Sequence, residues 1–482
     1  MADVLLIYPK TDQDVKNVNI FFPITLVSIA GSLMKKGFSV KIIDQRINSN
    51  YENKIKKELN KNPLCVGFSV ATGRQIKHSL DMSVLIKKIN PNLKIVWGGV
   101  HPTLSPIQTI QHPFIDIIVK GEGEETFVEL VEALKKKKDL KEIKGISYKK
   151  NNKIYHNYRR PYMDLEKIPD FPFHLVNPRN YFIDIKTSKK TLLLFSSRGC
   201  QNNCKFCYNG SIHKSTWRSM SASKTFNLLQ RAKELGATCV KFGDENFFYG
   251  RKRIQELYQI TKKEKSDVNI STTSTLEDLR PFTKKFGEQL VKTNFLDIFI
   301  GIETISKKLQ KYINKPINTN DLLKLNKNFN NLDIFLKYSF IMGFPNETKN
   351  DIQESLDVIK RLMAENKQSA HYINIFSPYY GTAIFNNSWK GYKNKPNPKK
   401  LEDWINYSWI IGRNPWVSKE RMSYIKRVIH FMYFLNNKDF IYTNRHKNHL
   451  IYKLYQEIAR VRCKMNFFNF APEIKIKQFI PR

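Results

Sequence analysis

The stretch Thr191–Gly210, TLLLFSSRGCQNNCKFCYNG, joins an apolar run to three closely spaced cysteines. The apolar run predicts a buried strand, and Cys200, Cys204 and Cys207 follow it within one short loop. The chain has six cysteines, and the other three are scattered as buried cysteines usually are. The spacing C-x3-C-x2-C can therefore bring three thiolates to one metal centre, whereas the scatter argues against a disulfide framework.

Three thiolates favour an iron–sulfur cluster over a structural zinc ion. Structural zinc sites are closed by four ligands, which usually come as two short-spaced pairs. No second cysteine pair or matching histidine pair follows the loop, and His213 is the nearby residue that could serve as a fourth ligand. A cluster held by three cysteines leaves one iron open, and thiolates suit such clusters. We therefore expect an iron–sulfur site rather than a zinc site.

The sequence around this loop predicts a barrel over residues 191–385. Helical stretches alternate there with six strand candidates, at 191–200, 238–246, 268–275, 297–304, 334–345 and 369–378. Six strand–helix units favour a partial (β/α)6 barrel of the TIM type, in which function lies in the loops that follow the strands.

Residues 1–140 predict a doubly wound, Rossmann-like α/β domain. Its apolar strand candidates are 3–9, 39–44, 65–70, 94–99 and 116–121, with helical stretches between them. This alternation implies a parallel sheet with helices on both faces, where ligands bind at the carboxyl ends of the strands. Small or polar residues stand at these ends, including Ser69, Thr72, Gly98, Gly99, His101 and Gly121.

Two further segments complete the expected organisation. Residues 141–190 are broken by prolines and rich in aromatic residues, which is typical of a connector. Residues 386–482 are expected to be mainly helical, and they hold 20 Lys and Arg against 6 Asp and Glu. This basic excess is consistent with an anionic or carrier-bound substrate, and also with a lysine-rich helical cover.

The 482-residue chain carries a net charge of +38, from 81 Lys and Arg against 43 Asp and Glu. Such an excess attracts anions, so one alternative is a nucleic-acid-binding protein with a structural iron–sulfur site. We favour a lysine-rich solvated surface, because net charge alone reports on solubility and non-specific binding and not on fold. No membrane span or signal segment is recognised, and we expect a cytoplasmic protein.

The cysteine loop resembles the signature of radical S-adenosylmethionine (radical SAM) enzymes, C-x3-C-x-aromatic-C after a strand, with Phe206 before the last cysteine. The resemblance implies that Cys200, Cys204 and Cys207 hold a 4Fe-4S cluster. The fourth iron would bind the amino and carboxylate groups of S-adenosylmethionine. An electron, delivered by an external reductant such as flavodoxin or ferredoxin, would then cleave that cofactor to a 5′-deoxyadenosyl radical.

A motif of the same family follows the next strand of the barrel. FGDENF at 242–247 resembles the family's segment that contacts the methionine ammonium, which implicates Asp244, Glu245 and Asn246. Acceptor carboxylates beside a cation make physical sense there. The alternative is an acidic strand end that caps the following helix.

Two later strand ends also resemble the family. FIGIETIS at 299–306 looks like its fourth-strand segment, with Glu303 or Thr304 near the cofactor ribose. FIMGFPNET at 340–348 looks like its fifth-strand segment, where Gly343 would let the backbone approach the cofactor closely.

The first domain is similar to the cobalamin-binding domain fused to many radical SAM enzymes. VGFSVATGRQI, WGGVHPTLSP and VKGEGEETFVEL occur in that family's order. The resemblance implies that Ser69 and Thr72 contact the nucleotide tail of cobalamin and that Gly98 and Gly99 let the tail run close to the sheet. The full set of residues implied in cobalamin binding is Ser69, Thr72, Gly98, Gly99, Gly121 and Glu122.

One departure from that family concerns the lower face of the cobalt. Many cobalamin domains carry Asp-x-His-x-x-Gly, whose histidine coordinates cobalt from below, but this chain has Arg46 in the histidine's place. His101 is a candidate substitute, although a histidine in a Gly-Gly-x-His-Pro turn more often forms local hydrogen bonds. We expect no histidine below the cobalt.

Together the resemblances, over residues 1 to about 385, imply a cobalamin-dependent radical SAM enzyme. The expected reaction is methyl transfer to an unactivated carbon (or phosphorus) centre of a small-molecule or peptide substrate. A non-methylating relative, such as an anaerobic magnesium-porphyrin monomethyl ester cyclase-like or rearrangement enzyme, is the alternative. A methylthiotransferase fits less well, because that family's first domain holds a second cluster on three cysteines and residues 1–190 contain only Cys65.

Overall fold

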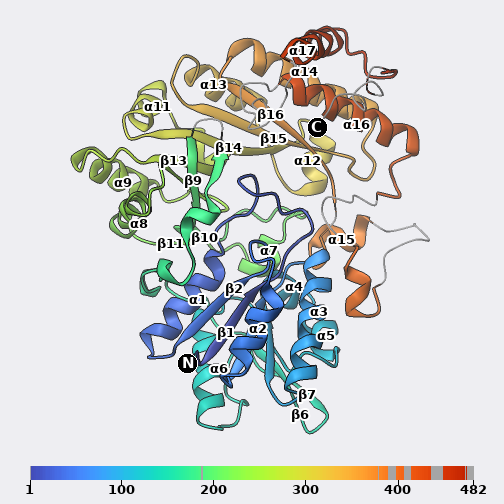
Figure 1. The fold of residues 1–482 in the computed structure, drawn as a ribbon. Coiled ribbons are helices and arrows are strands. Elements are labelled where there is room, and N and C mark those ends of the chain that lie inside the picture. The colour runs from blue at the N-terminus through green and yellow to red at the C-terminus, as the bar shows by residue number, and fades with distance from the viewer. Residues whose placement is uncertain are drawn as a thin grey trace.

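The computed structural model describes residues 2–185, 188–377, 379–388, 398–406, 414–435, 449–472 and 474. Within them the chain forms two α/β units, each built on a seven-stranded sheet, and C-terminal helices pack beyond the second sheet (Figure 1). None of the described helices is long and apolar enough to cross a membrane.

The first sheet has the strand order β2-β1-β3-β4-β5-β6-β7. Strands β1 to β5 are parallel, and their apolar side chains are buried, as expected of a parallel sheet covered on both faces. These strands are β1 (Val4–Tyr8), β2 (Val40–Asp44), β3 (Cys65–Ser69), β4 (Lys94–Gly98) and β5 (Ile117–Val119). The predicted doubly wound fold is confirmed.

Helices cover both faces of the first sheet (Figure 1). Two helices that contact each other are α1 (Ile24–Lys35) and α6 (Glu124–Lys135), and a second contacting pair is α2 (Tyr51–Leu59) and α3 (Arg74–Ile89). Two short helices follow β4, namely α4 (Val100–Leu104) and α5 (Pro106–Gln111).

The first sheet extends into the stretch that the sequence assigned to a connector. Strand β6 (Ile146–Lys150) pairs antiparallel with β5, and β7 (Lys153–His156) pairs antiparallel with β6. Asn151 and Asn152 join the two strands with positive φ at both residues, a turn that asparagine tolerates well. Residues 157–182 are irregular, with the 3-10 turns η1 (Leu165–Lys167), η2 (Phe173–Leu175) and η3 (Pro178–Tyr181).

The second sheet has the strand order β16-β15-β14-β13-β12-β9-β8. All of its strands are parallel except β8, which pairs antiparallel at one edge. Its strands are β8 (Ile183–Ile185), β9 (Ser188–Leu194), β12 (Cys239–Phe242), β13 (Asn269–Thr275), β14 (Phe295–Glu303), β15 (Phe335–Met342) and β16 (Ser369–Ile375). The two edge strands do not pair, so the sheet is an open half-barrel, as the prediction of a partial barrel requires.

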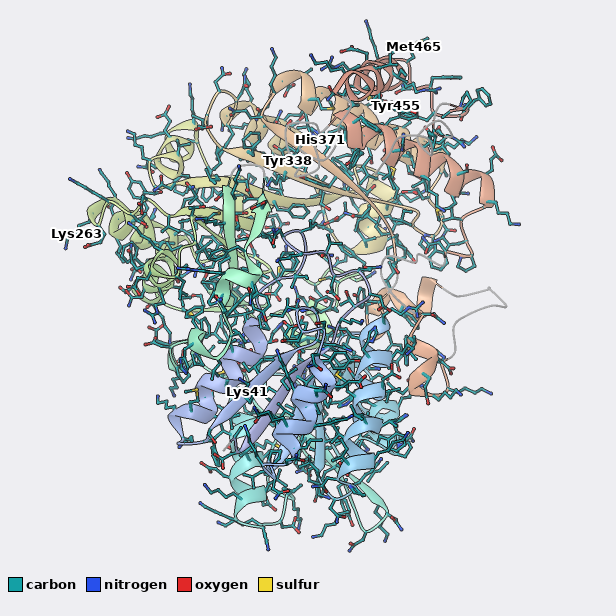
Figure 2. All side chains as sticks on the ribbon, in the orientation of Figure 1. Lys41, Lys263, Tyr338, His371, Tyr455 and Met465 are labelled. Carbon is teal, nitrogen blue, oxygen red and sulfur yellow. The ribbon has the colours of Figure 1, made fainter. Side chains whose placement is uncertain are left out.

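Helices cover the convex face of the half-barrel. They are α8 (Ala222–Glu234), α9 (Arg251–Lys263), α10 (Leu276–Leu279), α11 (Lys284–Val291), α12 (Lys307–Ile313), α13 (Thr319–Asn328) and α14 (Lys349–Glu365). Strand residues that point toward these helices are buried. Tyr338 and His371, for example, are paired in register on β15 and β16, and their ring centroids lie 5.7 Å apart (Figure 2).

The described part of the C-terminal region is mainly helical, as predicted. Helix α16 (Lys419–Leu435) packs against β16 and against α17 (His449–Lys464). The segments α15 (Ala383–Ser388) and η4 (Leu401–Trp404) reach back to the first unit (Figure 1). There the fully buried indole of Trp404 donates a hydrogen bond to Gln108 Oε1 at 2.7 Å.

Candidate active site

A cavity of about 320 Å³ lies between the first sheet and the half-barrel. The carboxyl ends of β3, β4 and β5 line one side, and the segments that follow β9 and β12 line the other. Because ligands bind at the carboxyl ends of parallel strands in both fold types, the two units direct their binding edges into one space. Predicted site residues that meet there are Ser69, Gly98, Gly99, Gly121, Glu122 and Glu245.

The cavity continues as an apolar slot between the first sheet and its helices. The slot is lined by Leu6, Gly67, Val96, Val119 and Phe127. At its mouth, a Cβ on Gly98 would meet no atom closer than Val119 at 3.7 Å. Gly121 has a φ of +84°, and a Cβ there would have no neighbour within 4 Å. The missing side chains leave room for an elongated organic group, so these residues fit the nucleotide tail of a cobalamin.

Thr72, Arg46 and His101 do not line this cavity. Thr72 Oγ1 lies 3.0 Å from His101 Nδ1, and the His101 ring packs against Trp404. Burial lowers the pKa of His101 to about 3, so its imidazole is neutral. Arg46 is ion-paired with Asp44 at 2.6 Å. Of the residues predicted to contact the nucleotide tail, Thr72 is thus turned to a neighbouring histidine instead.

The cysteine loop follows β9 and the short strand β10 (Ser197–Arg198), and α7 (Asn209–His213) comes after it. Cys200 is buried, and Cys204 and Cys207 are half-buried. Burial raises the pKa of all three thiols, that of Cys204 to about 11 and that of Cys207 to about 12. Thiolates in this loop therefore need a positive partner, which an iron cluster supplies when bound.

The three thiols lie close enough to affect one another's pKa: Cys200 raises the pKa of Cys204, and both raise the pKa of Cys207. Cys207 N–H donates to the Cys204 carbonyl at 3.1 Å, which curls the loop. Among the described residues, no group of three His, Cys, Asp or Glu side chains is arranged to hold one metal ion.

A largely buried lysine that no sequence motif indicated lies beside this loop. Lys315 borders a second cavity of about 180 Å³, together with Gln201, Cys204 and Thr275. Its Nζ lies 2.9 Å from Glu303 Oε1. Burial opposes the charge of Lys315, but Glu303 and the nearby cysteine thiols raise its pKa. Lys315 therefore supplies a fixed positive charge at the cysteine loop.

The three polar residues after β12 have different environments. Asp244 is buried and accepts hydrogen bonds from Ser196 N–H and from the hydroxyls of Ser196 and Ser197, at 2.6–2.7 Å. Asn246 donates to Asp278 Oδ2 at 2.7 Å. Glu245 alone lines the cavity between the units, where Oε2 accepts the Gly199 N–H at 3.0 Å. Burial raises the pKa of Glu245, so its ionised carboxylate needs a positively charged partner to stabilise it.

The residues predicted at the ends of β14 and β15 also have different environments. Glu303, with a φ of +68°, turns its carboxylate to Lys315 at the cysteine loop. Thr304 is buried, and its hydroxyl accepts the Ser306 N–H at 3.3 Å. Gly343 instead faces the C-terminal region, where its carbonyl accepts from Trp416 Nε1 at 2.8 Å, while its N–H donates to the nearby Glu347 Oε2 at 2.6 Å.

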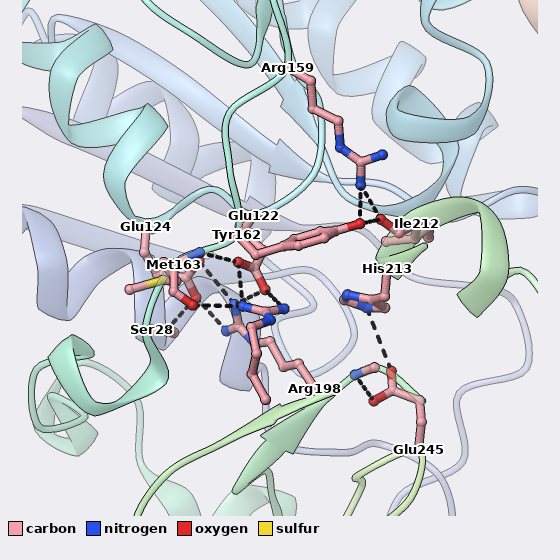
Figure 3. A network of polar contacts seen from close by, with 12 residues as sticks. Ser28, Glu122, Glu124, Arg159, Tyr162, Met163, Arg198, Ile212, His213 and Glu245 are labelled. Carbon is pink, nitrogen blue, oxygen red and sulfur yellow. Dashed lines mark hydrogen bonds and ion pairs between the residues drawn. The ribbon is translucent and has the colours of Figure 1, made fainter. Parts of the chain in front are cut away.

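Two arginines of the half-barrel bind two glutamates of the first unit across the cavity (Figure 3). Arg198 donates to both oxygens of Glu124, at 2.5 and 3.2 Å, and lies 3.3 Å from Glu122. Arg218, on β11 (Arg218–Ser219), donates to both oxygens of Glu122, at 3.0 and 2.8 Å. Burial opposes the charges, but the pairing raises the pKa of Arg198 and lowers the pKa of Glu124. Glu122, predicted as a cofactor contact, is thus engaged by both arginines.

Two family models match the two units. The model of the B12 binding domain matches residues 15–131, and the model of the radical SAM superfamily matches residues 194–359. The solved structure of the cobalamin-dependent radical enzyme OxsB, with aqua-cobalamin and S-adenosylmethionine bound, is 18% identical. It covers 99% of this chain and 74% of its own, with a TM-score of 0.74. The methyltransferase TsrM from Kitasatospora setae, with cobalamin and a [4Fe-4S] cluster bound, is 15% identical and has a TM-score of 0.65, over 81% of this chain and 76% of its own.

Two curated relatives align with this chain over different shares of their own lengths. An uncharacterized methyltransferase of Pyrococcus horikoshii is 28% identical over 443 residues, which is 90% of this chain and 93% of the relative. An anaerobic magnesium-protoporphyrin IX monomethyl ester cyclase of Cereibacter sphaeroides is 24% identical over 69% of this chain, which spans about half (55%) of the cyclase.

The half-barrel with its three-cysteine loop and the doubly wound domain before it together define a class of enzyme. The chain belongs to the radical SAM enzymes that carry an N-terminal B12-binding domain. The cofactors of that class are a 4Fe-4S cluster, S-adenosylmethionine and cobalamin.

Proposed function

We propose that this enzyme is a methyltransferase that acts on an unactivated carbon, or a phosphorus, centre of a small-molecule or peptide substrate. The observation that carries the proposal is the cavity shared by the two units, because Arg198 and Tyr208, which flank the cysteine loop, line it together with the glycines of the cobalamin slot. When bound, the cluster would supply the electron that cleaves S-adenosylmethionine, and cobalamin would supply the methyl group.

The residues of the chain would divide the work as follows. Cys200, Cys204 and Cys207 would hold the cluster, and Glu245 would accept hydrogen bonds from the methionine ammonium. Lys315 would face the methionine carboxylate, because it is the buried cation beside Cys204. The first-unit glycines would hold the cobalamin tail in its slot, and the walls of the cavity would exclude water from the radical.

The long alignment with a relative named as a methyltransferase supports methyl transfer over the cyclase alternative, since the cyclase relative is much longer than this chain. The test uses protein reconstituted with all three cofactors, a one-electron reductant and S-adenosylmethionine labelled in its methyl group. Label in the product, together with 5′-deoxyadenosine, is expected. A product that forms without the label would instead favour the non-methylating alternative.

A C204A variant serves as the control for cluster chemistry. It is expected to lose the cluster and 5′-deoxyadenosine formation together. If wild-type protein with a full cluster forms no 5′-deoxyadenosine, the proposed function is wrong.

A further inference from the structure

The concave face of the half-barrel carries two lysines below the cofactor site. Lys241 on β12 is in register with Ser271 on β13, and Ser271 is in register with Asp297 on β14. Lys337 on β15 is in register with Phe299, two residues beyond Asp297. Residues in register on parallel strands share a face, so these side chains point into the same interior.

This interior is partly open. Outward-facing strand residues such as Val240, Ile298 and Leu336 are fully buried, whereas their inward-facing neighbours Lys241 and Phe299 are only partly buried. Lys241 stands close to the carboxyl end of β12, and Gly243 and Glu245, which follow the strand, line the cavity between the units. Lys241 is next to the last residue of β12, and Glu245 is four residues further along the chain.

The polar groups of this face are unevenly paired. Asp297 accepts a hydrogen bond from Ser271 Oγ at 2.6 Å, and its other oxygen lies 3.0 Å from Lys337 Nζ. Lys241 forms no hydrogen bond or ion pair with any described residue. Burial lowers the pKa of Lys241, Asp297 opposes this effect, and the positive charge of Lys337 lowers the pKa further.

Two lysines beside one carboxylate leave an excess positive charge on this partly buried face, which is unfavourable unless an anion neutralises it. We propose that Lys241 and Lys337 bind a phosphate or carboxylate group of the substrate on the concave face of the half-barrel. This inference rests on the proposed function, because it places the substrate between that face and the cofactor cavity. The substrate would therefore be an anion. Its charged group would lie at the two lysines, and its reacting atom would lie in the cofactor cavity.

The test measures anion binding by the full-length, cluster-reconstituted chain with isothermal titration calorimetry in 0.2 M sodium chloride. The probes are pyrophosphate for the phosphate class and malonate for the carboxylate class. K241M removes the charge and keeps the length of the side chain, and K263Q removes an exposed lysine of α9 as the matched control (Figure 2). Wild type and K263Q are expected to bind at least one probe equally, and K241M at least tenfold more weakly.

Thermal unfolding separates binding from a structural role. Removal of a partly buried cation that has no hydrogen bond or ion pair with a described residue is expected to leave the melting temperature of K241M equal to or above that of wild type. Equal anion affinity of K241M and wild type, no binding of either probe by wild type, or a K241M chain that fails to fold would each overturn the proposal. Formation of 5′-deoxyadenosine is measured separately on the wild-type sample, so a failure of the proposed function is not confused with a failure of this site.

Discussion

Arg198 and Glu124 form a buried ion pair at 2.5 Å that joins the cysteine loop of the half-barrel to the first turn of α6 in the first unit. Arg198 is two residues before Cys200, and Glu124 is held on its other side by Ser28 Oγ at 2.7 Å. The cysteine loop and the cobalamin slot are therefore fixed to each other by side chains and not only by the connector. We expect this pair to set the distance between the two cofactors.

Replacing Arg198 with Met is expected to loosen the contact between the two units. The change leaves Glu124 buried without its partner, which costs about 3–5 kcal/mol for a buried pair. In scanning calorimetry, the two units of the variant should unfold in two separate transitions, whereas those of wild type should unfold closer together in temperature. Arg231→Met removes an exposed arginine that pairs with Glu234, and it should shift unfolding by less than about 1 kcal/mol. An unchanged transition in R198M would show that other contacts hold the units together.

Gly98 provides a test of the cobalamin slot that spares the fold. A Cβ at this position makes only ordinary contact with Val119, so Gly98→Ala is expected to fold and to retain cobalamin. Gly98→Leu extends a larger side chain into the slot and should weaken cobalamin binding at least tenfold, measured by absorbance titration of the apo-protein. Iron content should be equal in both variants. Full cobalamin affinity of the leucine variant would place the tail elsewhere.

The elements predicted from the sequence were those with a local signal. The strands of both sheets are short apolar runs, and the three cysteines lie within eight residues, so periodicity and spacing were sufficient. The pair Arg198–Glu124 joins residues 74 positions apart, and no local pattern reports such a contact. Lys315 is one of 81 Lys and Arg residues, and only burial beside Cys204 distinguishes it. The β6–β7 hairpin did have a signal, the Asn-Asn turn, which the prolines of the following segment obscured.

The sequence also does not indicate which of the polar residues after β12 lines the cavity. Asp244, Glu245 and Asn246 follow one strand, so the sequence predicts that they share an edge but not which carboxylate is free. Tertiary packing decides this, because the hydroxyls of Ser196 and Ser197 donate hydrogen bonds to Asp244, whereas Glu245 lines the cavity.

Lys315 is expected to tune both cofactor binding and the cluster. Lys315→Gln removes a positive charge beside the thiols, so the cluster should become harder to reduce and its midpoint potential should fall. The affinity for S-adenosylmethionine should fall at least tenfold if the ammonium group of Lys315 faces the methionine carboxylate of that cofactor. Potentiometric titration followed by electron paramagnetic resonance and equilibrium binding measure the two effects. Lys311→Gln, at an exposed position of α12, is the charge-matched control and should change neither.

Glu347 gives the protein a pH-dependent stability. Its Oε2 accepts the Gly343 N–H at 2.6 Å, and burial raises the pKa of Glu347 to about 8 from an ordinary 4.5. Between these two values the folded chain binds a proton that the unfolded chain releases, so the contribution of Glu347 to stability falls as the pH rises from 4.5 to 8. From pH 6 to pH 9 this loss is about 2–4 kcal/mol.

Glu347→Gln keeps an acceptor for Gly343 and removes the titration. The variant is therefore expected to melt at nearly the wild-type temperature at pH 6 and above it at pH 9, as measured by thermal unfolding at both values. Glu354→Gln changes an exposed carboxylate of α14, the helix that follows Glu347, and should follow wild type at both pH values. If the melting temperatures of E347Q and wild type differ by the same amount at pH 6 and pH 9, Glu347 does not take up a proton in the folded state and the pairing with Gly343 is that of an ordinary carboxylate.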